Sequence, residues 1–454
     1  MIEWEEFYMK VRKSKKVLVV LMSILLSGSC LLSACTKTNE QSTVNNPANN
    51  APLELPDGYG YSWTRDTNFS SLSAEEQLEL VNTAFIEEGF LAQVHSIDIA
   101  PNEDIYVSGA VTYGTAADIL GDSATYCALL VRYDKDLNLI KSLIVSDYGA
   151  FFTIGIDNNG YIYVEGTDHD GYTIVKYDAA LNEVRRQETI PLTSLNSTVF
   201  SADGYLFMSG SIMTNIEEHS FSAIIAKYTT DLELVDYVTW DDDRINNFQK
   251  LAVASDNSVY AIGNAAAPNL LDFTAVLCKY DSNLELLQTV IKTKKTNLRF
   301  DDIAIGKDDS VFVLYDPGYT ESARTNDTFE HIIIKYSANL DELCLFSSEN
   351  VLSAETDSFQ YFSCYLSSLA VDKNGFVYCA GTVEATTTNE PLRYYVIAIV
   401  LSEELSLLNI SLCTVDKGFL VAGICLSDNA DVYIAGSLNN NGTVFEPKSS
   451  LIIK

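Results

Sequence analysis

The sequence predicts an all-β protein, a seven-bladed β-propeller of four-stranded antiparallel blades that is closed by an N-terminal strand completing the last blade. Three observations predict this fold. One strand–turn–strand pattern recurs seven times, tight turns rich in Asn, Asp and Gly join the strands of each copy, and the last copy lacks a fourth strand. Such turns favour antiparallel hairpins over parallel strands joined by helices.

The second strand of each copy carries an aromatic residue, and consecutive aromatics are 44 to 66 residues apart. Four strands in a unit of this size are typical of a propeller blade, whereas the rungs of a parallel β-helix are about half as long. The aromatic positions are Tyr106, Tyr163, Phe207, Tyr260, Phe312, Tyr378 and Tyr433. A glycine follows at Gly109, Gly166, Gly210, Gly263, Gly381 and Gly436, and the fifth copy has Tyr315 instead.

The third strand of most copies ends in a cation followed by tyrosine. These pairs are Arg132-Tyr133, Lys176-Tyr177, Lys227-Tyr228, Lys279-Tyr280 and Lys335-Tyr336. The sixth copy departs from the pattern with Ile399-Val400, and the seventh has Lys454. A short turn and a leucine come next, and we expect this leucine to open the fourth strand. The leucines are Leu137, Leu181, Leu232, Leu284, Leu340 and Leu405.

A segment before the first copy supplies the missing fourth strand. Residues 78–83 (LELVNT) resemble the fourth strand at 232–237 (LELVDY), so we expect them to pair with the last blade and remove an open sheet edge. The alternative is a helix, because residues 73–76 (SAEE) resemble a capping box. We favour the strand, since tertiary pairing overrides weak local propensity.

The N-terminal residues carry the features of a processing signal. A basic stretch from Lys10 to Lys16 precedes an apolar run from Val17 to Leu32, which indicates a secretory signal peptide over residues 1–34. Because residues 1–8 are acidic, Met9 is the better translation start. The run ends in residues 32–35 (LSAC), which resemble a bacterial lipobox. That resemblance implies cleavage before Cys35 and attachment of diacylglycerol to its thiol; the alternative is an ordinary secretory signal.

The expected organisation follows from these segments. Residues 35–56 contain the lipidated cysteine and a flexible linker, 57–77 form a segment before the domain, and 78–454 form the propeller. We expect a monomer on the bacterial cell membrane or surface, extracytoplasmic and held through the lipid on Cys35. A formal charge of -33 excludes nucleic acid as a partner. The cysteines after Cys35 lie in apolar strands without a CxxC motif, which favours free, buried thiols.

The repeats resemble the bacterial SBBP-type β-propeller repeats, whose units have a similar Asp-x-x-Gly-x-x-Tyr-x-x-Gly-x-Thr core. Residues 157–167 and 372–382 match best, and the resemblance covers residues 78–454. Copies four, five and seven lack the turn glycine and have Ser258, Ser310 and Ala430. The resemblance implies a seven-bladed propeller on a secreted or anchored protein, and it brings no assigned activity or catalytic residues.

Function is expected on one face of the propeller. The second-to-third and fourth-to-first connections vary in length and lie together, and we call this side the variable-loop face. Its aromatic, acidic and basic residues suit carbohydrate or peptide recognition, although each one alone is more commonly just a solvated loop residue. The candidates are Asp168, His169, Asp170, Tyr172, Trp240, Asp241, Asp242, Asp243, Arg244, Lys294, Lys295, Arg299, Tyr319 and Tyr361.

The sequence contains no recognisable catalytic or metal-binding motif. The four histidines are scattered, and the Asp168–Gly171 segment lacks the full calcium-loop pattern. Calcium at Asp168 and Asp170, or at Asp241–Asp243, remains only a weak alternative to having no cofactor. The leading hypothesis is a non-enzymatic, membrane-anchored lipoprotein that binds an unknown protein or carbohydrate ligand. The alternatives are a propeller enzyme of glycoside hydrolase or lyase type that uses rim carboxylates, and a scaffold of an envelope complex.

Overall fold

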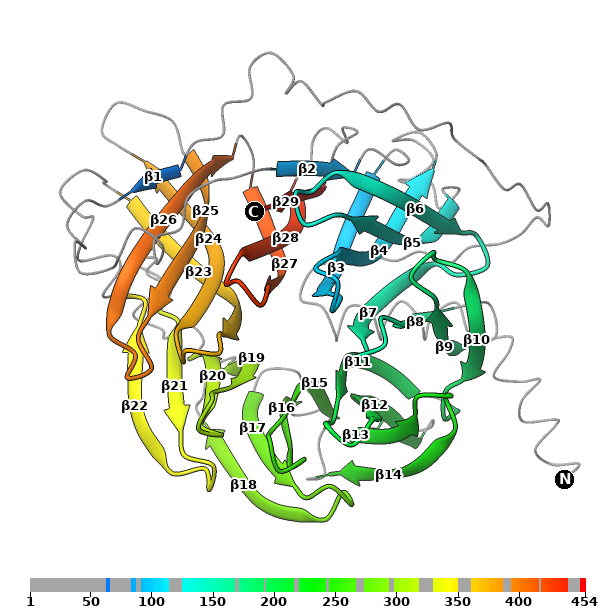
Figure 1. Cartoon of the computed structure of the whole chain (residues 1–454). Coiled ribbons are helices and arrows are strands. Elements are labelled where there is room, and N and C mark those ends of the chain that lie inside the picture. The colour runs from blue at the N-terminus through cyan, green and yellow to red at the C-terminus, as the bar shows by residue number, and fades with distance from the viewer. Residues whose placement is uncertain are drawn as a thin grey trace, which may run out of the picture.

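The computed structural model describes residues 63–65, 83–86, 91–113, 125–167, 171–191, 193–215, 220–241, 245–266, 273–293, 298–317, 330–349, 361–386, 393–415, 418–439 and 450–454. These residues form antiparallel sheets arranged as a ring, with the first strand of each repeat nearest the axis (Figure 1). No helix in this part of the chain is long and apolar enough to cross a membrane.

The sheets follow one another in chain order. The first comprises β3 (Leu91–Ile99), β4 (Ile105–Tyr113), β5 (Thr125–Tyr133) and β6 (Leu139–Val145). The second comprises β7 (Ala150–Ile156), β8 (Ile162–Thr167), β9 (Tyr172–Tyr177) and β10 (Glu183–Glu188). The third comprises β11 (Thr193–Phe200), β12 (Tyr205–Asn215), β13 (Ser220–Thr229) and β14 (Leu234–Trp240). The fourth comprises β15 (Ile245–Val253), β16 (Val259–Ala266), β17 (Phe273–Tyr280) and β18 (Leu286–Thr293).

The last three sheets complete the ring. The fifth comprises β19 (Arg299–Ile305), β20 (Val311–Asp316), β21 (Ile332–Tyr336) and β22 (Glu342–Ser347). The sixth comprises β23 (Tyr361–Val371), β24 (Val377–Thr386), β25 (Arg393–Leu401), β26 (Leu407–Val415) and β1 (Trp63–Arg65). The seventh comprises β27 (Gly418–Leu426), β28 (Val432–Asn439), β29 (Ser450–Ile453) and β2 (Thr83–Ile86).

The expectation of seven four-stranded blades is wrong, because only six sheets have four strands. In the remaining sheet, β1 adds a fifth strand by pairing antiparallel with the outer strand β26, so that Trp63 faces Cys413 across the pair. An N-terminal strand does close the ring, since β2 pairs with β29. That strand is Thr83–Ile86. Residues 78–82, where we expected it to begin, and the alternative helix at 73–76 lie outside the described residues.

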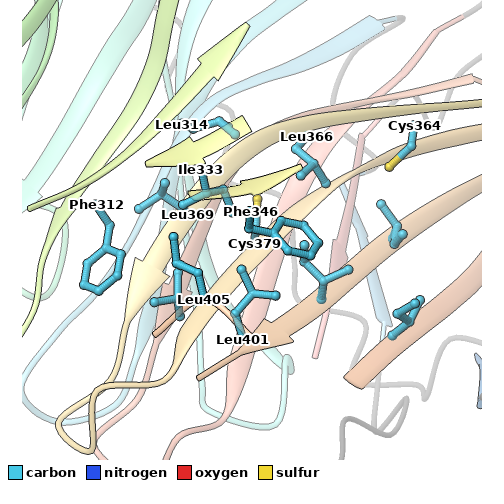
Figure 2. Packing of buried hydrophobic residues seen from close by; sticks show 14 of the residues in the cluster. Phe312, Leu314, Ile333, Phe346, Cys364, Leu366, Leu369, Cys379, Leu401 and Leu405 are labelled. Carbon is cyan, nitrogen blue, oxygen red and sulfur yellow. The ribbon is translucent and has the colours of Figure 1, made fainter. Parts of the chain in front are cut away.

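The hydrophobic core lies between neighbouring sheets. Figure 2 shows one such layer, in which Phe312, Leu314 and Phe346 of the fifth sheet pack on Leu366 and Leu405 of the sixth. Similar apolar clusters fill the other interfaces, from the first and second sheets to the sixth and seventh. Because each sheet is covered on both sides by its neighbours, its inner strands are apolar almost throughout.

The recurring cation and aromatic hold neighbouring sheets together. In the fourth sheet, Lys279 Nζ and the Tyr260 hydroxyl both donate to the carbonyl of Ala338, in the third-to-fourth-strand turn of the fifth sheet, each at 2.8 Å. We call this pair of hydrogen bonds the inter-sheet clamp. At four other interfaces, the equivalent turn carbonyl of the next sheet accepts hydrogen bonds from the side chains at these positions. The donors are Arg132 with Tyr106, Lys176 with Tyr163, Lys227 alone, and Lys454 with Tyr433. Lys335 instead reaches the Glu404 carboxylate.

The leucine after the third strand does not open the fourth strand. In all six copies this leucine lies in the turn with φ between 58° and 65°, and the strand begins two residues later. A left-handed leucine is unfavourable by itself. The side chains are at most 5% exposed, so burial offsets the backbone strain. In the first-to-second-strand turns, the left-handed residue of copies four and five is Asn257 and Asp309, not the serine that follows.

The prediction of free thiols after Cys35 is confirmed. Cys127, Cys278, Cys364, Cys379, Cys413 and Cys425 are buried, Cys344 is partly buried, and all seven are free. Burial raises the pKa of Cys278 to about 12 and also raises the pKa values of Cys364, Cys379, Cys413 and Cys425, so these thiols pack as small apolar groups. The signal peptide, Cys35 and the linker lie outside the described residues.

Candidate functional site

Most of the predicted ligand-binding residues lie outside the described residues. These are Asp168, His169, Asp170, Asp242, Asp243, Arg244, Lys294, Lys295 and Tyr319. Of the others, Tyr361 is the first residue of β23, where it faces Thr386 of β24 across the pair. The side chains of Tyr172, Trp240, Asp241 and Arg299 are described, and they lie in three different parts of the ring.

In two of these parts of the ring, the side chains of the predicted residues are already engaged in contacts within the fold. The Tyr172 hydroxyl is hydrogen-bonded to the Ser194 side chain, and burial raises the pKa of Tyr172 to about 12. Trp240 packs against Phe248 of the next sheet with ring centroids 6.2 Å apart. The neighbouring Asp241 is exposed, and its carboxylate accepts a hydrogen bond from Ser222 Oγ at 2.7 Å. These contacts attach the ends of strands to one another, so we do not place the site here.

The innermost strand of every sheet has a β-bulge at the same position, which lies opposite the recurring glycine in six sheets and opposite Tyr315 in the fifth. In the fourth sheet Phe248 faces Gly263 and Lys250 faces Ile262, so no residue of β16 lies opposite Gln249 in the strand pair. A Cβ on Gly263 would lie 2.0 Å from the Asn247 carbonyl oxygen, which explains why glycine recurs there. The bulged residues are His95, Phe152, Asn196, Gln249, Asp301, Ser367 and Ala422.

The bulges place side chains between neighbouring inner strands near the variable-loop face. His95 Nδ1 lies 3.0 Å from the Phe151 carbonyl of the next sheet, and its ring stacks on Phe152 with centroids 5.3 Å apart. Asn196 likewise donates to Asn247 Oδ1 at 2.8 Å. In the fifth sheet the bulged residue is an acid, Asp301, and it differs from the others because it lies among further charged groups.

The fifth sheet gathers an ionic cluster where three strands meet the variable-loop face. Arg299 begins β19, Asp316 ends β20 and faces Arg299 across the pair, and His331 directly precedes β21. Arg299 Nε lies 2.6 Å from Asp301 Oδ1 and 3.6 Å from Asp316 Oδ2. We call Arg299, Asp301, Asp316 and His331 the rim cluster. The Arg299 side chain is 48% exposed, so solvent and solutes can reach the cluster.

Two polar atoms of the rim cluster are buried without a hydrogen-bond partner among the described residues. They are Asp301 Oδ2 and His331 Nδ1. The backbone of His331 is fixed, because its N–H donates to Ser348 Oγ at 2.9 Å and its carbonyl accepts from the Ser348 N–H at 2.8 Å. An unpartnered buried polar atom costs free energy, so its presence at an accessible cluster is a feature of sites that complete their hydrogen bonds with a ligand.

The protonation states of the rim cluster follow from burial and charge. Burial raises the pKa of Asp301 to about 7, with Arg299 opposing and Asp316 adding to the rise. Burial lowers the pKa of His331 to about 4, so its imidazole is neutral at pH 7. Asp301 therefore exists in both forms near neutral pH, which is the condition for a group that donates or accepts a proton.

Sequence reasoning found one residue of the rim cluster and missed three. Arg299 was chosen as part of a basic segment with Lys294 and Lys295, yet its charge is matched by the two carboxylates beside it. In the sequence, His331 is one of four scattered histidines, and no motif distinguishes Asp301 or Asp316. Aligning the seven copies at the bulge would have identified Asp301, because it is the acid among otherwise uncharged bulge residues.

Comparison with known proteins finds only solved structures of low similarity, and it shows neither a family nor an activity. No family model matches the chain, and no curated protein matches its sequence. A catalytically inactive virginiamycin B lyase from Staphylococcus aureus has a TM-score of 0.48 and 10% identity, over 82% of this chain and 99% of that one. Polysaccharide lyase Uly1 has a TM-score of 0.46 and 11% identity, over 85% and 94%. Drosophila Plexin A, in complex with Semaphorin 1b, has a TM-score of 0.44 and 9% identity, over 83% and 87%. Similarities at these levels carry no argument about what this chain binds or converts.

Proposed function

We propose that this chain is an extracytoplasmic, lipid-anchored β-propeller that binds a hydroxyl-rich ligand, such as a neutral glycan, at the rim cluster. The observation that carries the proposal is the free carboxylate oxygen of Asp301, which is buried beside the half-exposed Arg299. A sugar hydroxyl can donate to this oxygen, and a second hydroxyl of the same ring can accept from the guanidinium.

The charge of the rim cluster supports a neutral or cationic ligand over an anionic one. Arg299 is offset by Asp316 and Asp301, and Glu330, whose carboxylate accepts a hydrogen bond from Ser347 Oγ at 2.9 Å, adds a further carboxylate nearby. The whole chain carries a formal charge of -33, so long-range electrostatics also repel anions. Acidic polysaccharides are therefore expected to bind weakly.

The test is calorimetric titration of the protein with neutral hexasaccharides of glucose, mannose and N-acetylglucosamine, and with an oligogalacturonate as the anionic comparison. We expect one neutral series to bind and Asp301→Asn to weaken that binding at least tenfold. Asp203→Asn is the matched control, because it removes one exposed carboxylate from a first-to-second-strand turn on the opposite face. Equal binding by wild type and Asp301→Asn, or binding of the anionic series alone, contradicts the proposal.

A second candidate function is catalysis on the same ligand class. It is favoured by the pKa of Asp301, near 7, because a carboxyl group at this pKa can act as a general acid or base at neutral pH. If the propeller is a glycoside hydrolase or lyase, Asp301→Asn abolishes the appearance of reducing ends or of unsaturated products even at glycan concentrations that saturate the weakened site. If wild type releases no product from the glycan that it binds, the protein is a binding protein.

The membrane anchor is a separate part of the proposal and rests on the lipobox-like residues 32–35. Cys35 precedes the first described strand by 28 residues, which leaves room for a tether between bilayer and ring. Mass spectrometry of the protein isolated from membranes should find diacylglycerol on an N-terminal Cys35. Cys35→Ser should move the protein from the membrane fraction to the soluble fraction, and unchanged membrane association would contradict the anchor.

A further inference from the structure

The seven bulged residues form a belt around the axis of the ring. Each lies on the innermost strand of its sheet, four positions before that strand ends, as Gln249 does in Ile245–Val253. All seven are partly exposed, although the residue before the bulge is buried in six of the seven sheets. Because the innermost strands surround the axis (Figure 1), these partly exposed side chains face it at one level. We call them the axial belt.

The side chains of the axial belt differ in size around the ring. From the fifth sheet onward, the neighbouring sheets contribute Asp301, Ser367, Ala422, His95, Phe152, Asn196 and Gln249. Ser367 and Ala422 are small and belong to adjacent sheets, whereas every other position carries a larger side chain. The belt therefore has most room at the sixth and seventh sheets, between the carboxyl group of Asp301 and the imidazole of His95.

The imidazole of His95 is held so that one nitrogen remains available. Its Nδ1 lies 3.0 Å from the Phe151 carbonyl oxygen, which can only accept, so Nδ1 carries the hydrogen. The ring lies parallel to Phe152, with an interplanar angle of 3°. Burial lowers the pKa of His95, so its ring is neutral at pH 7 and Nε2 is a hydrogen-bond acceptor. No residue in the described part of the chain donates to Nε2.

The two groups that flank the small residues recognise the same chemical partner. Nε2 of His95 accepts a hydrogen bond from a hydroxyl group, and so does Oδ2 of Asp301, which has no donor among the described residues. A chain of sugar residues carries hydroxyl groups at regular intervals. One such chain can therefore donate to both ends of the gap, whereas a single sugar at Asp301 does not need His95.

We propose that the ligand of the rim cluster is a linear neutral oligosaccharide that runs along the axial belt from Asp301 to His95. It passes the small residues Ser367 and Ala422 on the way. This inference rests on the proposed function and specifies its ligand, because it requires a chain of several sugar residues. Asp301 belongs to both the rim cluster and the belt, so the chain continues from one to the other, and His95 selects for its length.

The experiment is calorimetric titration of the full chain with two-, four- and six-residue oligosaccharides of glucose, mannose and N-acetylglucosamine. In wild type we expect the hexasaccharide of one series to bind at least tenfold more tightly than its disaccharide. His95→Asn should remove this difference, because asparagine keeps a donor for the Phe151 carbonyl and lacks Nε2. The fold accepts asparagine at this position, since Asn196 of the third sheet donates to the equivalent Phe248 carbonyl at 3.4 Å.

A second variant narrows the gap between the two ends. Ser367→Gln with Ala422→Gln gives both positions the residue that the fourth sheet carries, Gln249. This double variant should weaken hexasaccharide binding at least tenfold. Ala202→Gln is the matched control and should bind as wild type does, because it adds the same side chain to an exposed turn on the opposite face.

The outcomes distinguish this inference from the proposed function. If Asp301→Asn weakens binding while His95→Asn and the glutamine double variant keep the length dependence of wild type, the ligand does not follow the belt and this inference alone is wrong. If no neutral oligosaccharide binds, or if Asp301→Asn has no effect, the proposed function fails and this inference fails with it. If the double variant does not fold, the comparison of His95→Asn with wild type decides.

Discussion

Replacing Asp301 by asparagine should stabilise the protein at alkaline pH. In the folded state the pKa of Asp301 is raised from 3.8 to about 7, so the folded protein holds this proton more tightly than the unfolded chain. Stability is therefore lost as pH rises from about 4 to about 7, and the loss is complete above that range. A shift of about three pKa units corresponds to a loss of about 4 kcal/mol of folding stability at most when Asp301 ionises. Asparagine does not ionise, so the variant does not lose this stability.

The pH dependence of this effect is the sharper quantity, because constant differences between the two side chains cancel. Between pH 5.5 and pH 8.5 the advantage of asparagine should grow by about 2 kcal/mol, which is the 1.5 pH units below the folded pKa multiplied by 1.36 kcal/mol per unit. The assay is urea unfolding of wild type and Asp301→Asn at both pH values, followed by fluorescence. Asp203→Asn, on the opposite face, should show the same stability difference at both. An Asp301→Asn protein whose relative stability is unchanged or falls between pH 5.5 and pH 8.5 refutes the assigned environment of Asp301.

Three further predictions concern the clamp, the bulge and the rim cluster. Lys279→Met should lower the free energy of unfolding by about 1.5–3 kcal/mol in urea, since it removes a charged donor from the Ala338 carbonyl; no change would show that Tyr260 holds that carbonyl alone. Gly263→Ala should lower the free energy of unfolding by about 3 kcal/mol. Gly149→Ala, where the nearest atom to a new Cβ is 3.5 Å away, should change it by no more than about 0.5 kcal/mol. Equal losses in the two variants would contradict the close approach at the bulge. Arg299→Gln should raise the pKa of Asp301 by roughly one unit in a carbon-13 NMR titration of the carboxyl groups, and a lowered pKa would contradict the ion pair.

The propeller was predictable because its signals repeat. The cation, the strand aromatic and the glycine recur together, and the structure gives each of them one physical task. Lys279 and Tyr260 hold the next sheet, and Gly263 allows the bulged strand to approach. Each copy needs the same type of residue at these positions, because the role of the residue depends on backbone geometry and close contact. The repeat can therefore be recognised within one sequence.

The fifth strand and the exact start of the closing strand were not predictable in the same way. Strand β1 is three residues long and is formed only by pairing with β26, more than 340 positions later. Neither composition nor an alternation of apolar and polar residues identifies such a segment as a strand, because only the folded ring brings β26 next to it. The buried leucines in left-handed turns were misread for a similar reason, since their apolar character indicates burial and does not distinguish a strand from a turn.

The rim cluster could be predicted only in part. Arg299 was chosen because it stands close to other basic residues, but its partners Asp301 and Asp316 are acids set by the bulge and by the register of β19 on β20. The separation of Arg299 and Asp316 along the chain gives no sign of their pairing. Burial, which determines the protonation of Asp301 and His331, is likewise a property of the folded ring.

The most direct test of the rim cluster as a binding site is proton exchange on ligand binding. Calorimetric titration of wild type at pH 7 with the neutral hexasaccharide that binds, in two buffers of different ionisation enthalpy, measures the protons taken up or released. A ligand that bonds to Asp301 must change its pKa, so we expect a measurable proton exchange in wild type and none in Asp301→Asn. Binding with no proton exchange in wild type would contradict a ligand site at Asp301.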